Sequence, residues 1–111
     1  MNKKNYIELR NVADFMDRQS LEIRLEYAMI VDMLEAEGRL SMPFGEKISG
    51  RNLFAIRVIN AGNIRVFYAY GRQNEIYGIH GYVKKTRTIP QKEMKQAEKI
   101  CKLLRAEGMI K

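Results

Sequence analysis

The chain has 111 residues, 20 basic and 13 acidic, and a formal net charge of +7. This length accommodates one hydrophobic core, so we expect a single domain over residues 1–111. No run of 18 apolar residues occurs, which excludes a membrane-spanning helix, and the first residues contain no signal-peptide apolar region. One cysteine and one histidine exclude an internal disulfide and argue against a zinc site. We therefore expect a cytoplasmic protein that has no metal, no cofactor and no membrane partner.

The charge is unevenly distributed along the chain. Residues 1–38 contain five basic and eight acidic side chains, a net charge of −3, whereas residues 39–111 contain 15 basic and five acidic ones, a net charge of +10. The basic part is expected to attract a polyanion such as nucleic acid, although a charge excess also serves solubility alone.

Two helices are expected in the acidic part. Residues 21–37 carry an apolar stripe with helical spacing, and Ser20 and Gly38 are suitable residues for the two helix ends. Residues 11–19 predict a shorter helix whose apolar side chains are Val12, Phe15 and Met16. Residues 6–9 fit either a short strand or an earlier start of that helix.

Strands are expected after residue 52. Residues 39–52 contain glycine, proline and serine, and we interpret them as a loop. Residues 53–59, 64–70 and 75–83 are rich in apolar, aromatic and β-branched side chains and are joined by turn-forming links, which predicts an antiparallel meander.

A last helix is expected to begin near Thr88. Residues 88–91 match a capping box with Pro90 in the first turn, and lysines line the face opposite the apolar stripe. The fold class is therefore α+β: two N-terminal helices, an antiparallel β-sheet meander of three or four strands, and a C-terminal helix.

Two arginines interrupt the expected strands. If residues 60–62 form a three-residue loop with Gly62 in the left-handed region, Arg57 lies opposite Arg65 on the same face. If residues 60–63 form the loop, the two side chains point to opposite faces. Directly opposed arginines repel each other, so a shared face suggests an anionic ligand; solvated outward positions are the alternative.

Residues 80–88 contain His80, Lys84, Lys85 and Arg87 between the third strand and the last helix. These residues also have a plain structural explanation: His80 would be a packed histidine, and the three cations would form a solvated basic turn. Strand tyrosines, Tyr82 among them, pack in cores more often than they stack on bases. Cys101 lies on the apolar stripe of the last helix and is expected in the core.

Three sequence blocks together resemble a known family. They are Leu53-Phe54-Ala55-Ile56-Arg57, then Asn63-Ile64-Arg65-Val66-Phe67-Tyr68, then Ile79-His80-Gly81-Tyr82-Val83-Lys84-Lys85-Thr86 followed by Pro90. This order is similar to the phage-derived HigB-like branch of the RelE/ParE toxin superfamily. Members begin with a β-strand, which only residues 6–9 can supply here.

The resemblance implies the toxin of a type II toxin–antitoxin system, with a RelE-like fold. Such toxins are endoribonucleases that cleave mRNA in the ribosomal A site, and a cognate antitoxin protein neutralises them. The family's functional positions correspond to Arg57 and Arg65 in the sheet and to Lys84 and Lys85 in the turn after it; His80 lies in the matching strand.

Metal-free RNA cleavage suits these residue types, because the ribose 2′-OH attacks the adjacent phosphate and cations stabilise the charge that develops. Arg57 and Arg65 would bind the phosphate. Lys85, or with less support Lys84, would stabilise charge or transfer a proton, and His80 is a reserve acid or base. Two other functions stay open: a non-nuclease member of the superfamily that acts on DNA gyrase, and a non-catalytic nucleic-acid-binding protein that uses the basic helix at residues 90–106.

Overall fold

The computed structural model describes residues 3–49 and 52–111. In chain order, the elements are β1 (Asn5–Glu8), α1 (Arg10–Asp17), α2 (Leu21–Glu37), β2 (Gly45–Ser49), β3 (Leu53–Val58), β4 (Ile64–Tyr70), β5 (Glu75–Val83) and α3 (Gln91–Ala106). The strands form one sheet in the order β1-β5-β4-β3-β2. The predicted α+β fold is confirmed, and the meander of β3, β4 and β5 is antiparallel as expected. The described residues form a five-stranded sheet instead of the expected three or four strands, and its β1–β5 pair is parallel.

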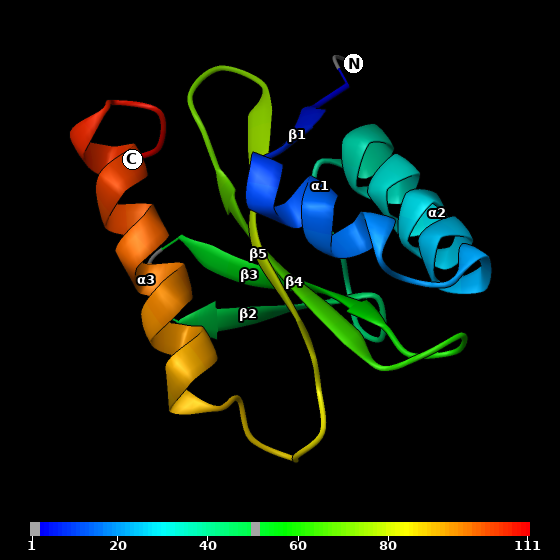
Figure 1. Ribbon diagram of the computed structural model, residues 1–111. Coiled ribbons are helices and arrows are strands. Elements are labelled where there is room, and N and C mark those ends of the chain that lie inside the picture. The colour runs from blue at the N-terminus through cyan, green and yellow to red at the C-terminus, as the bar shows by residue number, and fades with distance from the viewer. Residues whose placement is uncertain (1–2, 50–51) are drawn as a thin grey trace.

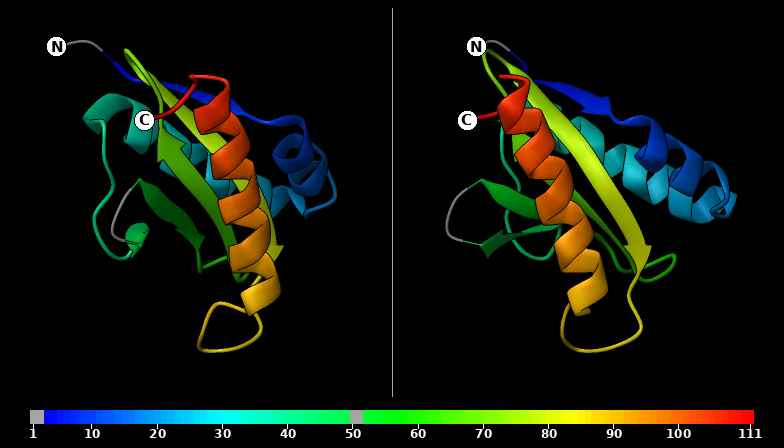
Figure 2. Two further views of the ribbon diagram at one scale, coloured as in Figure 1. Left: turned by 90° about the vertical axis from the view of Figure 1, so that its left-hand side faces the viewer. Right: turned by 60° about the vertical axis from the view of Figure 1, so that its left-hand side comes forward.

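Helices cover both faces of the sheet (Figure 1). Helices α1 and α2 pack on one face, where their apolar side chains meet Ile56, Val66 and Tyr68. Helix α3 packs on the other face against Phe67 and Ile79, and Figure 2 shows it crossing the strands in front of the sheet. The central strand β4 is therefore buried on both faces, which explains its nearly continuous apolar sequence. No helix in the described residues is long and apolar enough to cross a membrane.

Helix α2 has the predicted ends. The Ser20 hydroxyl accepts a hydrogen bond from the backbone N–H of Ile23 at 3.3 Å, and Gly38 adopts a left-handed conformation with φ of 78°. Helix α1 spans Arg10–Asp17, close to the expected residues 11–19, and it buries Val12 and Met16.

The uncertain segment at residues 6–9 forms part of a strand. Strand β1 pairs in parallel with the first half of β5, so that Tyr6 is the register partner of Ile76. The Tyr6 hydroxyl is 2.8 Å from that of Tyr27, and its backbone N–H donates to the Glu35 carboxylate at 2.9 Å. These contacts with α2 explain why four residues form a stable edge strand.

The loop expected at residues 39–52 was wrong in part, because Gly45–Ser49 forms the edge strand β2. It pairs antiparallel with β3 and has a register shift between Lys47 and Ser49. A short edge strand needs little intrinsic β-propensity, since its neighbour supplies the hydrogen bonds; for this reason the glycine and serine content was misleading.

The predicted start of α3 was also wrong. The helix begins at Gln91, the residue before it is Pro90, and no side chain caps it. The Thr88 carbonyl accepts a hydrogen bond from the Thr86 hydroxyl at 2.8 Å, so Thr88 belongs to the preceding loop and not to a capping box.

The connection between β3 and β4 gives the register expected from a three-residue loop, by a different mechanism. Among the described glycines only Gly38 and Gly108 have positive φ, so Gly62 is not in the left-handed region. Instead the Glu26 carboxylate of α2 accepts hydrogen bonds from the backbone N–H groups of Ile59, Asn60 and Ala61 at 2.7–3.2 Å. A helix side chain therefore stabilises the turn that sets the arginine register.

Candidate functional site: a basic row across the sheet

Three polar side chains lie in one row across the three central strands, near the end where β3 and β5 finish and β4 begins. Arg57 of β3 is the direct register partner of Arg65 of β4, and Arg65 is the partner of Tyr82 of β5. Partners in neighbouring strands point to the same face. This Arg57–Arg65–Tyr82 row lies on the face that α3 covers, since the alternating neighbours Ala55 and Phe67 pack in the core on that side.

The two arginines approach each other closely. The Arg57 backbone N–H donates to the Phe44 carbonyl at 2.8 Å, which lies on the side away from β4. Arg57 and Arg65 are therefore a non-hydrogen-bonded pair of the antiparallel ladder, the kind in which side chains are nearest. Two like charges in this position destabilise the sheet unless an anion compensates them.

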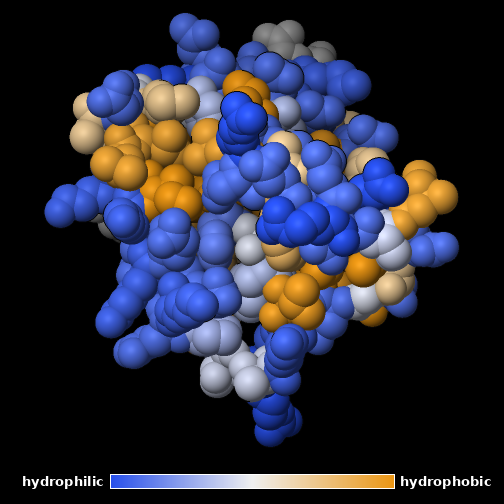
Figure 3. Space-filling view, in the orientation of Figure 1, coloured by the Kyte–Doolittle hydropathy of each residue, from blue (hydrophilic) through white to orange (hydrophobic). Residues whose placement is uncertain are grey.

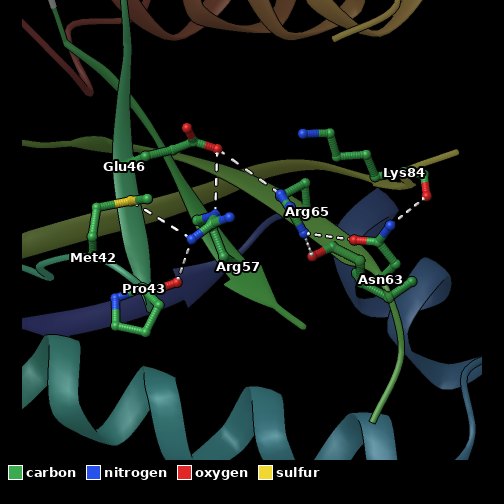
Figure 4. Close-up of polar contacts among 8 residues, drawn as sticks. Met42, Pro43, Glu46, Arg57, Asn63, Arg65 and Lys84 are labelled. Atoms are coloured by element: carbon green, nitrogen blue, oxygen red, sulfur yellow. Dashed lines mark hydrogen bonds and ion pairs between the residues drawn. The ribbon is translucent and has the colours of Figure 1, made fainter. Parts of the chain in front are cut away.

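Glu46 of β2 provides part of that compensation (Figure 4). Its Oε1 atom lies 3.8 Å from Nε of Arg57 and 3.9 Å from Nε of Arg65. These are ion pairs, but the distances are too long for hydrogen bonds. One carboxylate facing two guanidinium groups leaves a net positive charge in the row.

The arginines differ in their remaining contacts. Arg57 donates from Nη1 to the Pro43 carbonyl at 2.9 Å, and Arg65 donates from Nη1 to Oδ1 of Asn63 at 3.0 Å. Arg65 is only 5% exposed. Burial lowers the pKa of its guanidinium, and the positive charge of Arg57 lowers this pKa further. Arg65 nonetheless stays charged near neutral pH, because arginine titrates far above it.

All three members of the row have a buried polar atom without a hydrogen-bond partner in the described residues: Nε of Arg57, Nε of Arg65 and the hydroxyl of Tyr82. Burial raises the pKa of Tyr82, although Arg65 opposes this effect, so the hydroxyl keeps its proton at neutral pH and remains a donor. Unsatisfied buried donors are costly. Three of them in one row, with surplus positive charge, define a site that suits a tetrahedral oxyanion such as phosphate.

Lys84 borders this site. Its backbone N–H donates to the Asn63 carbonyl at 2.8 Å, and its carbonyl accepts from Nδ2 of Asn63 at 2.9 Å. Figure 4 shows the Lys84 side chain extending on the Arg65 side toward the space beside Glu46. Lys85 follows in the exposed loop before α3. Lys85 was expected, before Lys84, to take part in the chemistry, whereas the structure brings Lys84 next to Arg65.

His80 occupies a separate position. Its Nε2 atom lies 2.7 Å from Oε1 of Glu93 on α3, and its ring stacks on Phe67 with centroids 6.2 Å apart. The Phe67 ring also stacks on Tyr82 at 5.6 Å. The pair with Glu93 joins β5 to α3 and fixes the orientation of the imidazole outside the arginine row.

The described residues contain no group of three or more histidine, cysteine, aspartate or glutamate side chains arranged to hold a metal ion. Cys101 lies on the buried side of α3 and is 4% exposed, and burial raises the pKa of its thiol. A buried cysteine that stays protonated is a poor nucleophile.

Two members of the site were missed from the sequence. Glu46 fell in the expected loop, yet it is the only acidic residue between Glu37 and Glu75, and this isolation among basic residues was an available signal. Tyr82 was expected mainly as a core residue. Only the strand register reveals that it continues the arginine row.

Comparison with known families gives one match. Residues 14–102 match the family described as "Phage derived protein Gp49-like (DUF891)". This match covers most of the chain, so the protein belongs to the phage-derived Gp49-like family. That family is associated with RelE-like toxins of toxin–antitoxin systems, and membership implies an antitoxin partner. A search of curated proteins gave no match.

Proposed function

We propose that this protein is the toxin of a type II toxin–antitoxin pair, in the HigB-like branch of the RelE/ParE superfamily, and that it cleaves mRNA on the ribosome. The observation that carries the proposal is the Arg57–Arg65–Tyr82 row with its three unpartnered buried donors. An RNA phosphate supplies oxygen acceptors for all three and the negative charge that the row lacks. Ribosome dependence rests on the family resemblance alone.

The chemistry follows from the groups around the row. The ribose 2′-OH attacks the adjacent phosphorus, a new 2′-O–P bond forms, and the bond from phosphorus to the 5′-oxygen breaks. Glu46 is the carboxylate in contact with both arginines, and it accepts the proton of the 2′-OH. The products are a 2′,3′-cyclic phosphate and a 5′-hydroxyl.

The leaving 5′-oxygen needs a proton. The Lys84 ammonium is our first candidate for the donor, because this side chain extends beside Arg65, and Tyr82 is the second. Lys85 and His80 remain candidates from the resemblance. Arg57 and Arg65 stabilise the extra negative charge on the phosphorane, a role in which one lost donor costs roughly 10²–10³ in rate.

The test is primer extension on mRNA from cells that express each variant. The wild type should create new 5′ ends in translated mRNA, and Arg65→Ala should reduce them by about 10²–10³-fold. Arg72→Ala is the matched control, because Arg72 is exposed and its Nε contacts only the Gly108 carbonyl among side-chain hydrogen bonds in the described residues. Circular dichroism confirms that each variant folds.

Two results decide against the proposal. If growth stops and no new 5′ ends appear, the nuclease function is wrong, and action on DNA gyrase or plain nucleic-acid binding becomes the better explanation. If folded Arg65→Ala cleaves at the wild-type rate, the row is not the catalytic site. A separate comparison of Lys84→Ala with Lys85→Ala shows which lysine acts in cleavage. We expect the larger loss of cleavage rate for Lys84→Ala.

A further inference from the structure

A second concave region lies beside the row, between α1, the outer edge of β5 and the first turns of α3. It has a volume of about 350 Å³, and its lining includes Phe15, His80, Gly81 and Gln96. The surface in this orientation is mainly hydrophilic in Figure 3, which views the molecule as Figure 1 does. Of the lining residues, the nuclease proposal uses only His80, as one candidate proton donor.

The pocket contains an open backbone edge. Strand β1 pairs only with Glu75–Gly78 of β5. At the next residue of β5, Nδ2 of Asn11 in α1 donates a hydrogen bond to the Ile79 carbonyl at 2.8 Å. Backbone groups alternate in direction along a strand, and Lys84 N–H points toward the β4 side. His80 and Tyr82 therefore turn their backbone groups to β4, whereas Gly81 turns its N–H and carbonyl outward. No partner for these two groups outside the sheet occurs in the described parts of the chain.

Aromatic rings flank this edge. A Cβ atom at position 81 would lie 2.6 Å from the Phe15 ring, so glycine permits the ring to pack directly against the backbone. His80 is held by Glu93 at 2.7 Å and stacked on Phe67. The pocket thus combines planar walls with one adjacent amide donor and carbonyl acceptor.

The rim of the pocket carries positive charge. Arg18, which directly follows α1, and Lys92 of α3 are both exposed there, and Glu93, the acidic residue of the lining, already contacts His80. The exposed Gln96 side chain adds an amide that can both donate and accept. Planar surfaces, paired amide groups and a cationic rim are the features with which proteins bind unstacked RNA bases.

We propose that this pocket binds the base of the nucleotide next to the scissile phosphate, with the base edge hydrogen-bonded to the Gly81 backbone and to Gln96. Gly81 directly precedes Tyr82 in β5, so the pocket adjoins the end of the row that Tyr82 forms. A protein strand fits less well, because Asn11 blocks the edge at Ile79 and leaves too short a stretch for pairing.

The inference rests on the proposed function for its RNA ligand, so its test uses ligands without a scissile bond. We would titrate the ¹⁵N-labelled full chain with adenosine and with uridine, which carry no phosphate, and separately with inorganic phosphate. Nucleosides should shift the Gly81 amide, the Gln96 side-chain amide and the His80 ring. Phosphate should instead shift the Nε resonances of Arg57 and Arg65.

Variants sharpen this test. Gln96→Ala and Phe15→Leu should each weaken nucleoside binding by roughly tenfold, the lower range for loss of one base contact, and leave phosphate binding unchanged. Lys99→Ala is the control on the same helix, because Lys99 is exposed outside the pocket. Gln96 is exposed, so its substitution should not affect folding.

The failure of this inference is distinguishable from the failure of the nuclease proposal. Nucleosides that leave the Gly81 amide unshifted at tens of millimolar would overturn the base pocket, whether or not the chain cleaves RNA. If the Gly81 and Val83 amides become protected from hydrogen exchange as the protein concentration rises, two copies of the chain pair at this strand edge. That result would overturn the base pocket. Nucleoside binding at Gly81 in a chain that cuts no RNA would support the pocket and contradict the nuclease.

Discussion

Arg57 and Arg65 lie directly opposite each other on β3 and β4, and their Nε atoms are 3.8 Å and 3.9 Å from the same oxygen of Glu46. Two guanidinium groups at the closest approach of an antiparallel ladder repel each other, and one loosely held carboxylate compensates only half of their charge. The sheet therefore retains an arrangement that is unfavourable for stability. We propose that an external anion relieves this repulsion and that the pair is its binding site.

The first prediction concerns Glu46. Glu46→Gln leaves both arginines without a counter-charge, so we expect the free energy of unfolding to fall by about 1 kcal/mol in dilute buffer. Inorganic phosphate should restore most of this loss, because it occupies the site of the carboxylate charge. Urea unfolding with and without phosphate measures both effects, and Glu98→Gln on the exposed side of α3 is the control. A loss that phosphate does not change would contradict anion binding at this site.

The second prediction concerns Tyr82. Tyr82→Phe removes a hydroxyl that has no hydrogen-bond partner and keeps the ring that stacks on Phe67. We expect the free energy of unfolding to stay the same or rise by up to about 1 kcal/mol, because the cost of an unsatisfied buried group is removed. RNA cleavage should fall by roughly 10²-fold, the lower end of the range for loss of one donor to the phosphate. Thermal unfolding and primer extension on the same variant test whether stability is kept while cleavage falls. Reduced stability would show that the hydroxyl is structural.

The third prediction concerns pH and Glu26. Burial disfavours the charged carboxylate, but hydrogen bonds from the backbone N–H groups of Ala61, Asn60 and Ile59 hold the pKa of Glu26 below its ordinary value of 4.5. A pKa lowered by folding adds stability above the unfolded-state pKa, and this stability is lost as the pH falls through the folded-state pKa. Glu26→Gln should therefore lower the free energy of unfolding by about 1 kcal/mol at pH 7, a figure discounted for the solvent exposure of Glu26, and by less near pH 3.

Urea unfolding from pH 7 to pH 3 measures this difference, with Asp32→Asn on the exposed side of α2 as the control. The same variant should also loosen the β3–β4 connection, and slower cleavage would follow because Arg57 and Arg65 lose their fixed register. A stability difference that is equal at pH 7 and pH 3 would show that the Glu26 charge does not stabilise the turn.

The fourth prediction concerns Cys101. The thiol is buried and its pKa is raised by burial, so the native protein should react with an aromatic disulfide reagent far more slowly than the urea-unfolded chain. Cys101→Ser should keep RNA cleavage and cost about 1 kcal/mol of stability, because it places a hydroxyl in the core. Loss of cleavage in a folded Cys101→Ser variant would show that the cysteine takes part in the reaction.

Elements with strong local patterns were predictable from the sequence. Helix α2 was predicted with its bounds and with both end residues, since helical periodicity, an N-terminal serine and a C-terminal glycine are local signals. Strands β4 and β5 were predicted with their bounds because their apolar runs are bracketed by turn residues. Arg57 and Arg65 were recognised as candidates because a charge inside an apolar strand is unusual.

Elements and contacts that depend on residues distant in the sequence could not be predicted and were found in the structure. Strand β2 exists because β3 offers hydrogen bonds, and β1 exists because β5 and α2 hold it. The shared face of Arg57 and Arg65 depends on the turn that Glu26 stabilises from α2. Glu46 and Tyr82 joined the site through strand register, which no local pattern encodes, because pairing partners are chosen by the whole sheet.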